Sequence, residues 1–203
     1  MPKRQKLLDE INAENGLGIF LMAQMDATPD TLQFIIATGE IDEAAGGLRD
    51  KSRYIIRALG VQEHRLSVGM FQRVQFTDEH PLLSQYNEKP VGVFFRGTPA
   101  DKHELVLDIF QTYASTFGHW RQIPDYLNLT KPLTDLVSGG GDLLGEMPES
   151  LATRMEKTLQ HHQLETKLTI GERPKEQPKM KVLTLDDSFT VAMDFSVDEL
   201  GKV

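Results

Sequence analysis

The residue types that most often take part in chemistry gather between positions 119 and 128. They are His119, Trp120, Arg121, Asp125 and Tyr126. An arginine binds carboxylates and phosphates through paired N–H groups, and a histidine carries protons near neutral pH. This combination indicates a pocket for a small anionic ligand. The alternative interpretation is structural: the two aromatic rings close one end of a core, and the arginine pairs with the acid.

A glycine-rich stretch, Gly139–Gly145, provides the other side of that hypothetical pocket. Glycine-rich loops that precede helices can hold phosphate on their backbone N–H groups. The spacing here matches neither a P-loop nor a dinucleotide fingerprint, and Asp142 would repel a phosphate. The simpler interpretation is a flexible connector.

Two further arginines, Arg65 and Arg73, lie on the polar side of a predicted strand, Arg65–Phe76. The other side of this strand is apolar at Leu66, Val68, Met70, Val74 and Phe76. Such alternation predicts a strand with one face on the core and the other facing water or a partner. Positive groups on an acidic protein favour an acidic partner segment or an anionic ligand. An ordinary solvated sheet face is the alternative.

Other reactive residue types do not form a recognisable set. The chain has no cysteine, which excludes disulfides, thiolate catalysis and thiolate metal ligands. The stretch Asp78–His80 and the pair His161–His162 lack the spacing of a metal site, and no serine stands in a nucleophile elbow. We therefore expect no metal, no cofactor and no catalytic residue. The sequence leaves open whether the protein is an enzyme, and it favours a non-enzyme.

Composition and charge limit the partners. The 203 residues carry a net charge of −8, with 26% charged residues and a pI near 5.3. An acidic surface repels nucleic-acid phosphates and anionic lipids, so we expect neither a nucleic-acid nor a membrane partner. The first residues are basic and lack the apolar core of a signal peptide. These features favour a cytoplasmic location.

Apolar patterns predict strands that come in neighbouring pairs. Hairpins are expected at Leu17–Ala23 with Thr31–Thr38 and at Met180–Leu185 with Phe189–Phe195, and single strands at Val91–Arg96 and Leu164–Ile170. Paired strands favour an antiparallel or mixed sheet over alternating β-α units. We predict an α+β fold with about six to seven strands in one sheet, flanked by three to five helices.

Helical spacing and end signals predict the helices. The expected helices are Lys3–Ala13, Ile41–Leu59 with a surer part from Leu48, Thr98–Phe117 ended by Gly118, Pro132–Val137, and a helix opened by Pro148. We predict a single domain over residues 1–203. A sub-boundary near residues 128–146 is possible, which would separate an α-ββ-α-ββ-α unit (1–128) from an α-βββ unit (146–203).

The predicted element order of the first 118 residues is helix, hairpin, helix, strands, helix. That order resembles roadblock and longin-like modules, and the resemblance implies a scaffold or dimerisation role. The lack of a catalytic set and the half-polar strands lead to the same hypothesis. It is a non-enzymatic binding, scaffold or regulatory protein that acts as a homo-oligomer through a sheet edge or face, or with a protein partner. The alternative is a small-molecule-binding protein or enzyme with its site around His119–Asn128 and the glycine stretch.

Overall fold

The chain forms two compact units. A computed structural model describes residues 3–42, 46–173 and 177–202. The first unit comprises residues 1–79 and 178–203, and the second unit comprises residues 80–177. The segment 128–146, named above as a possible sub-boundary, lies inside the second unit, and the single-domain organisation stays a prediction.

The fold class is α+β, with antiparallel pairing throughout. The described residues contain twelve strands in three antiparallel sheets, and five α-helices. The expectation of six to seven strands in one sheet is therefore wrong in detail, because several segments predicted as helix, connector or one long strand form additional strands. None of the helices in the described part of the chain combines the length and apolar character needed to cross a bilayer.

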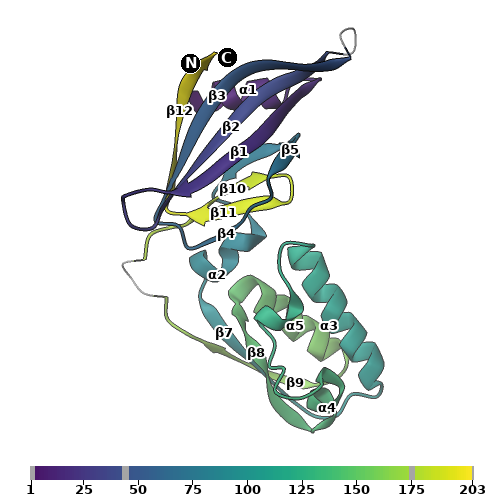
Figure 1. The fold of residues 1–203 in the computed structure, drawn as a ribbon. Helices are drawn as coiled ribbons and strands as arrows, with labels where there is room; N and C mark the ends of the chain where they lie inside the picture. The colour runs from purple at the N-terminus through teal and green to yellow at the C-terminus, as the bar shows by residue number, and fades with distance from the viewer. Residues whose placement is uncertain (1–2, 43–45, 174–176, 203) are drawn as a thin grey trace. The chain divides into compact units, whose positions relative to one another are not determined.

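The first unit contains a five-stranded sheet in the order β12-β3-β2-β1-β5 (Figure 1). Its strands are β1 (Gly16–Met25), β2 (Thr31–Asp42), β3 (Gly47–Leu59), β5 (Gly69–Phe71) and β12 (Asp194–Lys202). The predicted first hairpin is confirmed, since β1 pairs antiparallel with β2. Its turn is set by Asp26, whose carboxylate accepts the N–H of Ala27 at 2.6 Å, and by Asp30, which adopts a left-handed conformation with φ of 53°.

The predicted helix Ile41–Leu59 is wrong. Residues 43–45, which formed part of its apolar stripe, lie outside the described residues, and the surer part from Leu48 belongs to β3. Burial in β3 alternates at Ser52, Tyr54, Ile56 and Ala58, as expected for a strand with one face on the core. β3 pairs with β2 along its length on one side, and with β12 from Ser52 to Leu59 on the other. The helix on which the resemblance to roadblock and longin-like modules depended is therefore absent.

The first unit also holds a four-stranded sheet in the order β4-β11-β10-β6. Its strands are β4 (Glu63–Arg65), β11 (Ser188–Ala192), β10 (Lys181–Leu185) and β6 (Val74–Thr77). The hairpin predicted near the C-terminus is confirmed by the β10–β11 pairing. The single strand predicted over Arg65–Phe76 is wrong, because this segment passes through β4, β5 and β6, which belong to two different sheets. Val68 and Met70 are consequently exposed, and Phe71 is buried.

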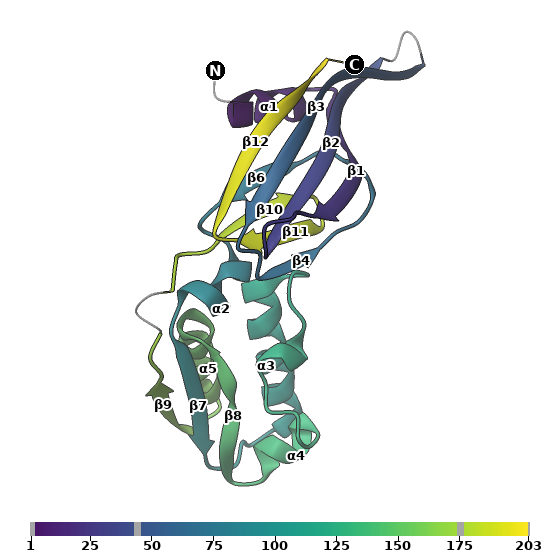
Figure 2. The same cartoon turned by 60° about the vertical axis from the view of Figure 1, so that its left-hand side comes forward.

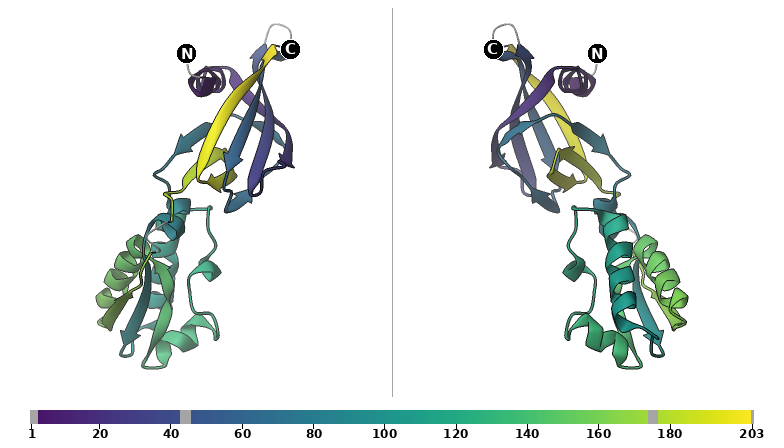
Figure 3. Two further views of the ribbon diagram at one scale, coloured as in Figure 1. Left: turned by 90° about the vertical axis from the view of Figure 1, so that its left-hand side faces the viewer. Right: turned by 90° about the vertical axis from the view of Figure 1, so that its right-hand side faces the viewer.

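Helix α1 (Lys3–Ile11) packs on the five-stranded sheet through Leu7 and Ile11, which are both buried (Figure 3). Its basic residues are bound to β12: Lys3 Nζ lies 2.6 Å from Asp198 and Lys6 Nζ lies 2.5 Å from Glu199. These ion pairs give the basic start of the sequence a structural role. The Lys3 amine, and then the Arg57 guanidinium, hold the pKa of the Asp198 carboxyl below its ordinary value.

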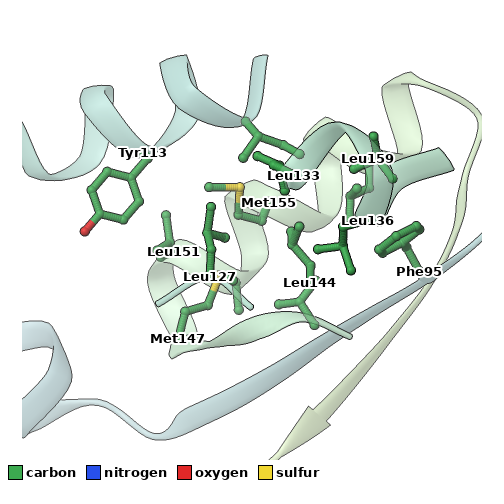
Figure 4. Close-up of a cluster of buried hydrophobic side chains, with 14 of the residues drawn as sticks. Phe95, Tyr113, Leu127, Leu133, Leu136, Leu144, Met147, Leu151, Met155 and Leu159 are labelled. Carbon is green, nitrogen blue, oxygen red and sulfur yellow. The ribbon is translucent and has the colours of Figure 1, made fainter. Parts of the chain in front are cut away.

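The second unit is a three-stranded sheet, β8-β7-β9, with helices packed on it (Figure 2). Its elements are α2 (Ser84–Asn87), β7 (Pro90–Arg96), α3 (Lys102–Phe117), α4 (Leu133–Ser138), β8 (Gly141–Pro148), α5 (Glu149–His161) and β9 (Glu165–Ile170), with short 3₁₀ helices at Pro81–Leu83 and Ile123–Asp125. The predicted helices α3, α4 and α5 are confirmed, with Asp101 rather than Thr98 capping α3. Figure 4 shows the core between helices and sheet, including Tyr113, Leu144, Met155 and Leu159.

Candidate interaction edge and the predicted pocket residues

The second half of β1 forms a sheet edge without a strand neighbour. β5 pairs with β1 only over Gly18–Phe20, whereas β2 pairs with β1 as far as Met25. Among the described strands, none pairs with Leu21–Met25 on the side away from β2. Figure 1 shows β5 beside one half of β1 only. We call residues 21–25 the free β1 edge.

The free β1 edge is uncharged, and all of its residues except Gln24 are apolar. All five of its residues are exposed, with exposed fractions of 44% for Leu21, 42% for Met22 and 66% for Met25. Native sheets normally protect such edges with charges, bulges or covering segments. The opposite edge of the same sheet follows that rule, because β12 carries Asp198 and Glu199 in ion pairs with α1. The free β1 edge has a bulge at Leu21 but no charge.

The hydrogen-bond pattern shows which backbone groups of this edge point outward. The N–H of Asp26 donates to the carbonyl oxygen of Thr31 at 2.9 Å, so this pair is hydrogen bonded. Bonded and non-bonded pairs alternate along an antiparallel ladder. The Met25–Leu32 pair lies one position from this bonded pair, and the Ala23–Phe34 pair lies three positions from it. Both are therefore non-bonded pairs. The N–H and C=O groups of Ala23 and Met25 consequently point away from β2 and can accept another strand.

A groove of about 230 Å³ lies where β5 leaves β1. It is lined by Phe20, by residues 67–71 and by the β10–β11 turn at residues 185–188. Val68 and Met70, at its rim, are 78% and 73% exposed. The segment that holds β5 thus exposes apolar side chains of its own, beside the residue at which the free β1 edge begins.

Arg65 and Arg73 lie beside the β10–β11 turn of the first unit. The guanidinium of Arg65 donates to the carbonyl oxygen of Asp187 at 3.1 and 3.3 Å and stacks over the ring of Phe189. The Asp186 carboxylate accepts the backbone N–H groups of Gln72 and Arg73 at 3.0 and 3.1 Å. Arg65 is therefore bonded to this turn, and the Nε of Arg73, whose side chain is 86% exposed, lies 3.5 Å from the Asp186 carboxylate. An acidic turn of their own unit thus lies beside both arginines.

His119 and Trp120 form an aromatic group with His80 in the second unit. The Trp120 ring lies 4.4 Å from the His119 ring and 5.1 Å from the His80 ring, measured between centroids. Trp120 is half-buried, and Nδ1 of His80 accepts the N–H of Leu82 at 3.2 Å. Arg121 contacts the same turn, because its guanidinium donates to the carbonyl oxygen of Leu82 at 3.4 Å. Burial, and then the nearby His119, lower the pKa of His80 below 6.5.

We expect the second unit to lose stability as the pH falls below the ordinary histidine pKa of about 6.5. The unfolded chain takes up a proton on His80 below pH 6.5, while the folded chain resists it, so the stabilising difference is lost as the pH falls through the lowered pKa of the folded state. Urea unfolding followed by Trp120 fluorescence measures this loss. His80→Asn keeps an acceptor for the Leu82 N–H and should flatten the pH dependence. An equal pH dependence in both proteins would contradict the assignment to His80.

Asp125 and Tyr126 line a pocket of about 250 Å³ in the second unit. Its other walls come from α2, the start of β7 and the end of β8: Ser84, Gln85, Glu88, Lys89, Pro90, Glu146, Met147 and Pro148. The Tyr126 hydroxyl donates to Gln85 Oε1 at 2.9 Å. Three carboxylates against one lysine make this pocket negative, in contrast to the expected site for an anion. The pocket includes Asp125 and Tyr126 but not His119, Trp120 or Arg121.

The glycine-rich stretch does contact the segment 119–128, but the two meet as closely packed backbone. Gly145 lies in β8 and forms a bridge with Leu127, and the N–H of Asn128 donates to the carbonyl oxygen of Leu144 at 2.7 Å. A Cβ added at Gly145 would lie 2.0 Å from the carbonyl oxygen of Tyr126. This contact leaves no space for a ligand between the two segments at that point. The flexible-connector interpretation is wrong for Gly141–Gly145, which is a strand.

Sequence reasoning did not identify the free β1 edge. Its available signal was the end of a longer uncharged run, Asn15–Met25, which stops at Asp26. Within the described residues, no group of three or more His, Asp or Glu residues is arranged to hold a metal ion. Comparison with known proteins finds no matching family model, no matching curated protein and no matching solved structure.

Proposed function

We propose that this chain is a non-enzymatic binding protein that acts in a homo-oligomer or with a protein partner through the free β1 edge. The observation that carries the proposal is an uncharged edge of five residues whose N–H and C=O groups at Ala23 and Met25 point away from β2. Addition of a strand to a sheet edge is a recurring mode of protein recognition. In that mode the backbone bonds supply affinity, and the side chains on each face supply specificity.

Exposed apolar surface supports this function. Leu21, Met22 and Met25 are each more than two-fifths exposed, and Val68 and Met70, in and next to β5, are exposed as well. Exposed apolar surface of this kind marks interaction sites on soluble proteins. Methionine side chains are flexible and polarisable, and they adapt to the surface of a partner.

The second candidate is a small-molecule-binding protein, and the pocket beside Asp125 and Tyr126 favours it. Its carboxylates, from Glu88, Asp125 and Glu146, would attract a cationic ligand rather than the anion expected from sequence. We rank it second because Glu88 and Asp125 already accept backbone N–H groups, from Ser150 at 2.8 Å and Gln122 at 3.2 Å.

Native mass spectrometry of the protein purified from its own source tests the proposal. We expect the wild type to carry a protein partner, either a second copy or another chain, and Ala23→Pro to carry none. Proline removes the outward N–H at position 23 and spares the ladder with β2, so the fold should persist, as circular dichroism would verify. Gln24→Ala is the matched control on the same strand, and it should keep the partner.

Two results of this experiment would overturn the proposed function. A small molecule that both the wild type and Ala23→Pro retain, with no protein partner in either sample, would overturn the proposed function and support the pocket. A partner that Ala23→Pro retains in full would also overturn it, because binding would then not use the free β1 edge.

A further inference from the structure

We infer that the strand accepted by the free β1 edge is the same edge of a second copy of this chain, paired antiparallel about a two-fold axis at Ala23. The inference rests on the proposed function and names its partner. The pairing would join two five-stranded sheets into one continuous sheet across the dimer. A two-fold axis uses the same surface on both copies and closes the assembly at two chains.

The length of the free β1 edge fits this arrangement. Pairing with β5 stops at Phe20, and the turn to β2 begins at Asp26, so residues 21–25 are available. Antiparallel pairing centred on the middle residue, Ala23, spans this segment, with the bulge at Leu21 at its end. Ala23 then lies opposite Ala23 of the second copy, and Met25 lies opposite Leu21 of the second copy. The edge is therefore complementary to itself in length.

The direction of the backbone groups selects the same centre. Both the N–H and the C=O of Ala23 point away from β2. Two such residues placed opposite each other exchange both N–H···O=C hydrogen bonds. They form a hydrogen-bonded pair of an antiparallel ladder. A centre at Gln24 would instead bring together two residues whose backbone groups face β2. The small side chain of Ala23 also permits close approach at the axis.

Charge favours a second copy over a charged partner. The chain carries a net charge of −8, so most of its surface opposes self-association, and the free β1 edge carries no charge. The nearest acid along the strand is Asp26, and its pKa is lowered by the Gln33 side-chain amide and then by the Ala27 N–H. In the proposed dimer the two Asp26 residues lie six residues apart, about 20 Å. Physiological salt largely screens repulsion over that distance.

A disulfide experiment tests the register. The chain has no native cysteine, so any disulfide must form between the introduced thiols. In the full chain, Ala23→Cys places two thiols opposite each other with Cα atoms about 5.5 Å apart, which suits a disulfide. Gln24→Cys is the matched control. It is an exposed neighbour whose Cα atoms would lie about 8 Å apart, beyond the reach of a disulfide. Under mild oxidation we expect covalent dimers from Ala23→Cys and none from Gln24→Cys, read on non-reducing gels. Equal cross-linking of both variants, or of neither, would overturn the register.

A charge exchange at the axis provides a second measurement. Ala23→Lys and Ala23→Glu each place like charges opposite each other, and each should weaken the dimer roughly tenfold or more. An equimolar mixture of the two should restore it as a mixed dimer. Sedimentation at micromolar concentrations measures the association, and circular dichroism verifies the fold of each variant. A mixture that stays monomeric while the wild type dimerises would contradict pairing at Ala23.

The outcomes separate this inference from the proposed function. Purified recombinant chain that stays monomeric at micromolar concentration would overturn the second-copy partner. If protein from its own source then carries a different chain that Ala23→Pro loses, the proposed function stands. If neither sample contains any protein partner, both fail.

Discussion

Gly145→Ala should lower the free energy of unfolding of the second unit by about 3 kcal/mol, because the added methyl group overpacks a backbone contact. The new Cβ would lie 2.0 Å from the carbonyl oxygen of Tyr126 and 3.0 Å from the Cα of Leu127. Backbone atoms cannot rotate away as a side chain does. The Leu127–Gly145 bridge and the bond from Asn128 to Leu144 must therefore loosen. Urea unfolding followed by Trp120 fluorescence measures the effect, since Trp120 is the one tryptophan and belongs to the second unit.

Gly139→Ala is the matched control in the same glycine-rich stretch. A Cβ there would meet nothing closer than 3.4 Å, and Gly139 has a φ of −75°, which suits any residue. We expect a change within about 0.5 kcal/mol. A flexible connector would tolerate both substitutions equally, so equal stabilities would contradict the assignment of Gly145 to a packed strand. The comparison also distinguishes a structural glycine from a ligand-binding one.

Glu10→Ala should destabilise the first unit by about 3 kcal/mol, because it removes the acceptor of two buried hydroxyl groups. The Glu10 carboxylate accepts from the hydroxyl of Thr38 at 2.5 Å and from that of Ser52 at 3.2 Å. Thr38 and Ser52 are 0% and 2% exposed. Burial, and then Glu10, raise the pKa of the neighbouring Tyr54 above its ordinary value. This polar group joins α1 to β2 and β3, so its loss should release the helix. Urea unfolding followed by circular dichroism gives the free-energy change, and hydrogen exchange of residues 3–11 locates it.

Asp9→Ala is the control on the same helix. Asp9 is exposed, and its carboxylate accepts a hydrogen bond from the exposed Gln5 side chain, so we expect little change in stability. Glu10→Gln keeps an oxygen acceptor and should fall between the two. If Glu10→Ala were as stable as Asp9→Ala, the polar group would not hold α1 in place.

Local patterns predicted the elements whose signals lie within a few neighbouring residues. Turn chemistry at Asp26–Asp30 located the first hairpin, Gly118 ended α3, and Pro148 preceded α5. In each of these, the chemistry of one or two residues restricts the backbone directly. The α+β class and the expectation of an antiparallel or mixed sheet followed from them.

For segments that are stabilised by distant neighbours, the secondary structure predicted from the sequence was wrong. Leu48–Leu59 has apolar residues at a spacing that also fits a helix, and it becomes a strand because β2 and β12 pair with its two edges. β12 begins more than a hundred residues later, so the local pattern does not contain this information. The segment Arg65–Phe76 alternates like one strand, yet it pairs with β11, β1 and β10 in turn.

The candidate sites divide in the same way. Asp125 and Tyr126, which the sequence singled out for ligand binding, line a pocket whose other acids, Glu88 and Glu146, follow α2 and belong to β8. His119, Trp120 and Arg121 instead pack around His80 and Leu82, which precede them by about forty residues.

By itself, the sequence determined the chemistry available to this protein: no thiol, a net negative charge, and an uncharged run from Asn15 to Met25. Only the tertiary structure decided that the last five residues of this run form a free edge. Whether a strand has one neighbour or two depends on where other segments stop. Here β5, some fifty residues further along the chain, stops pairing at Phe20. The hydrogen-bonding capacity of a backbone is the same at every residue, so only the arrangement of distant strands reveals where that capacity is left unused.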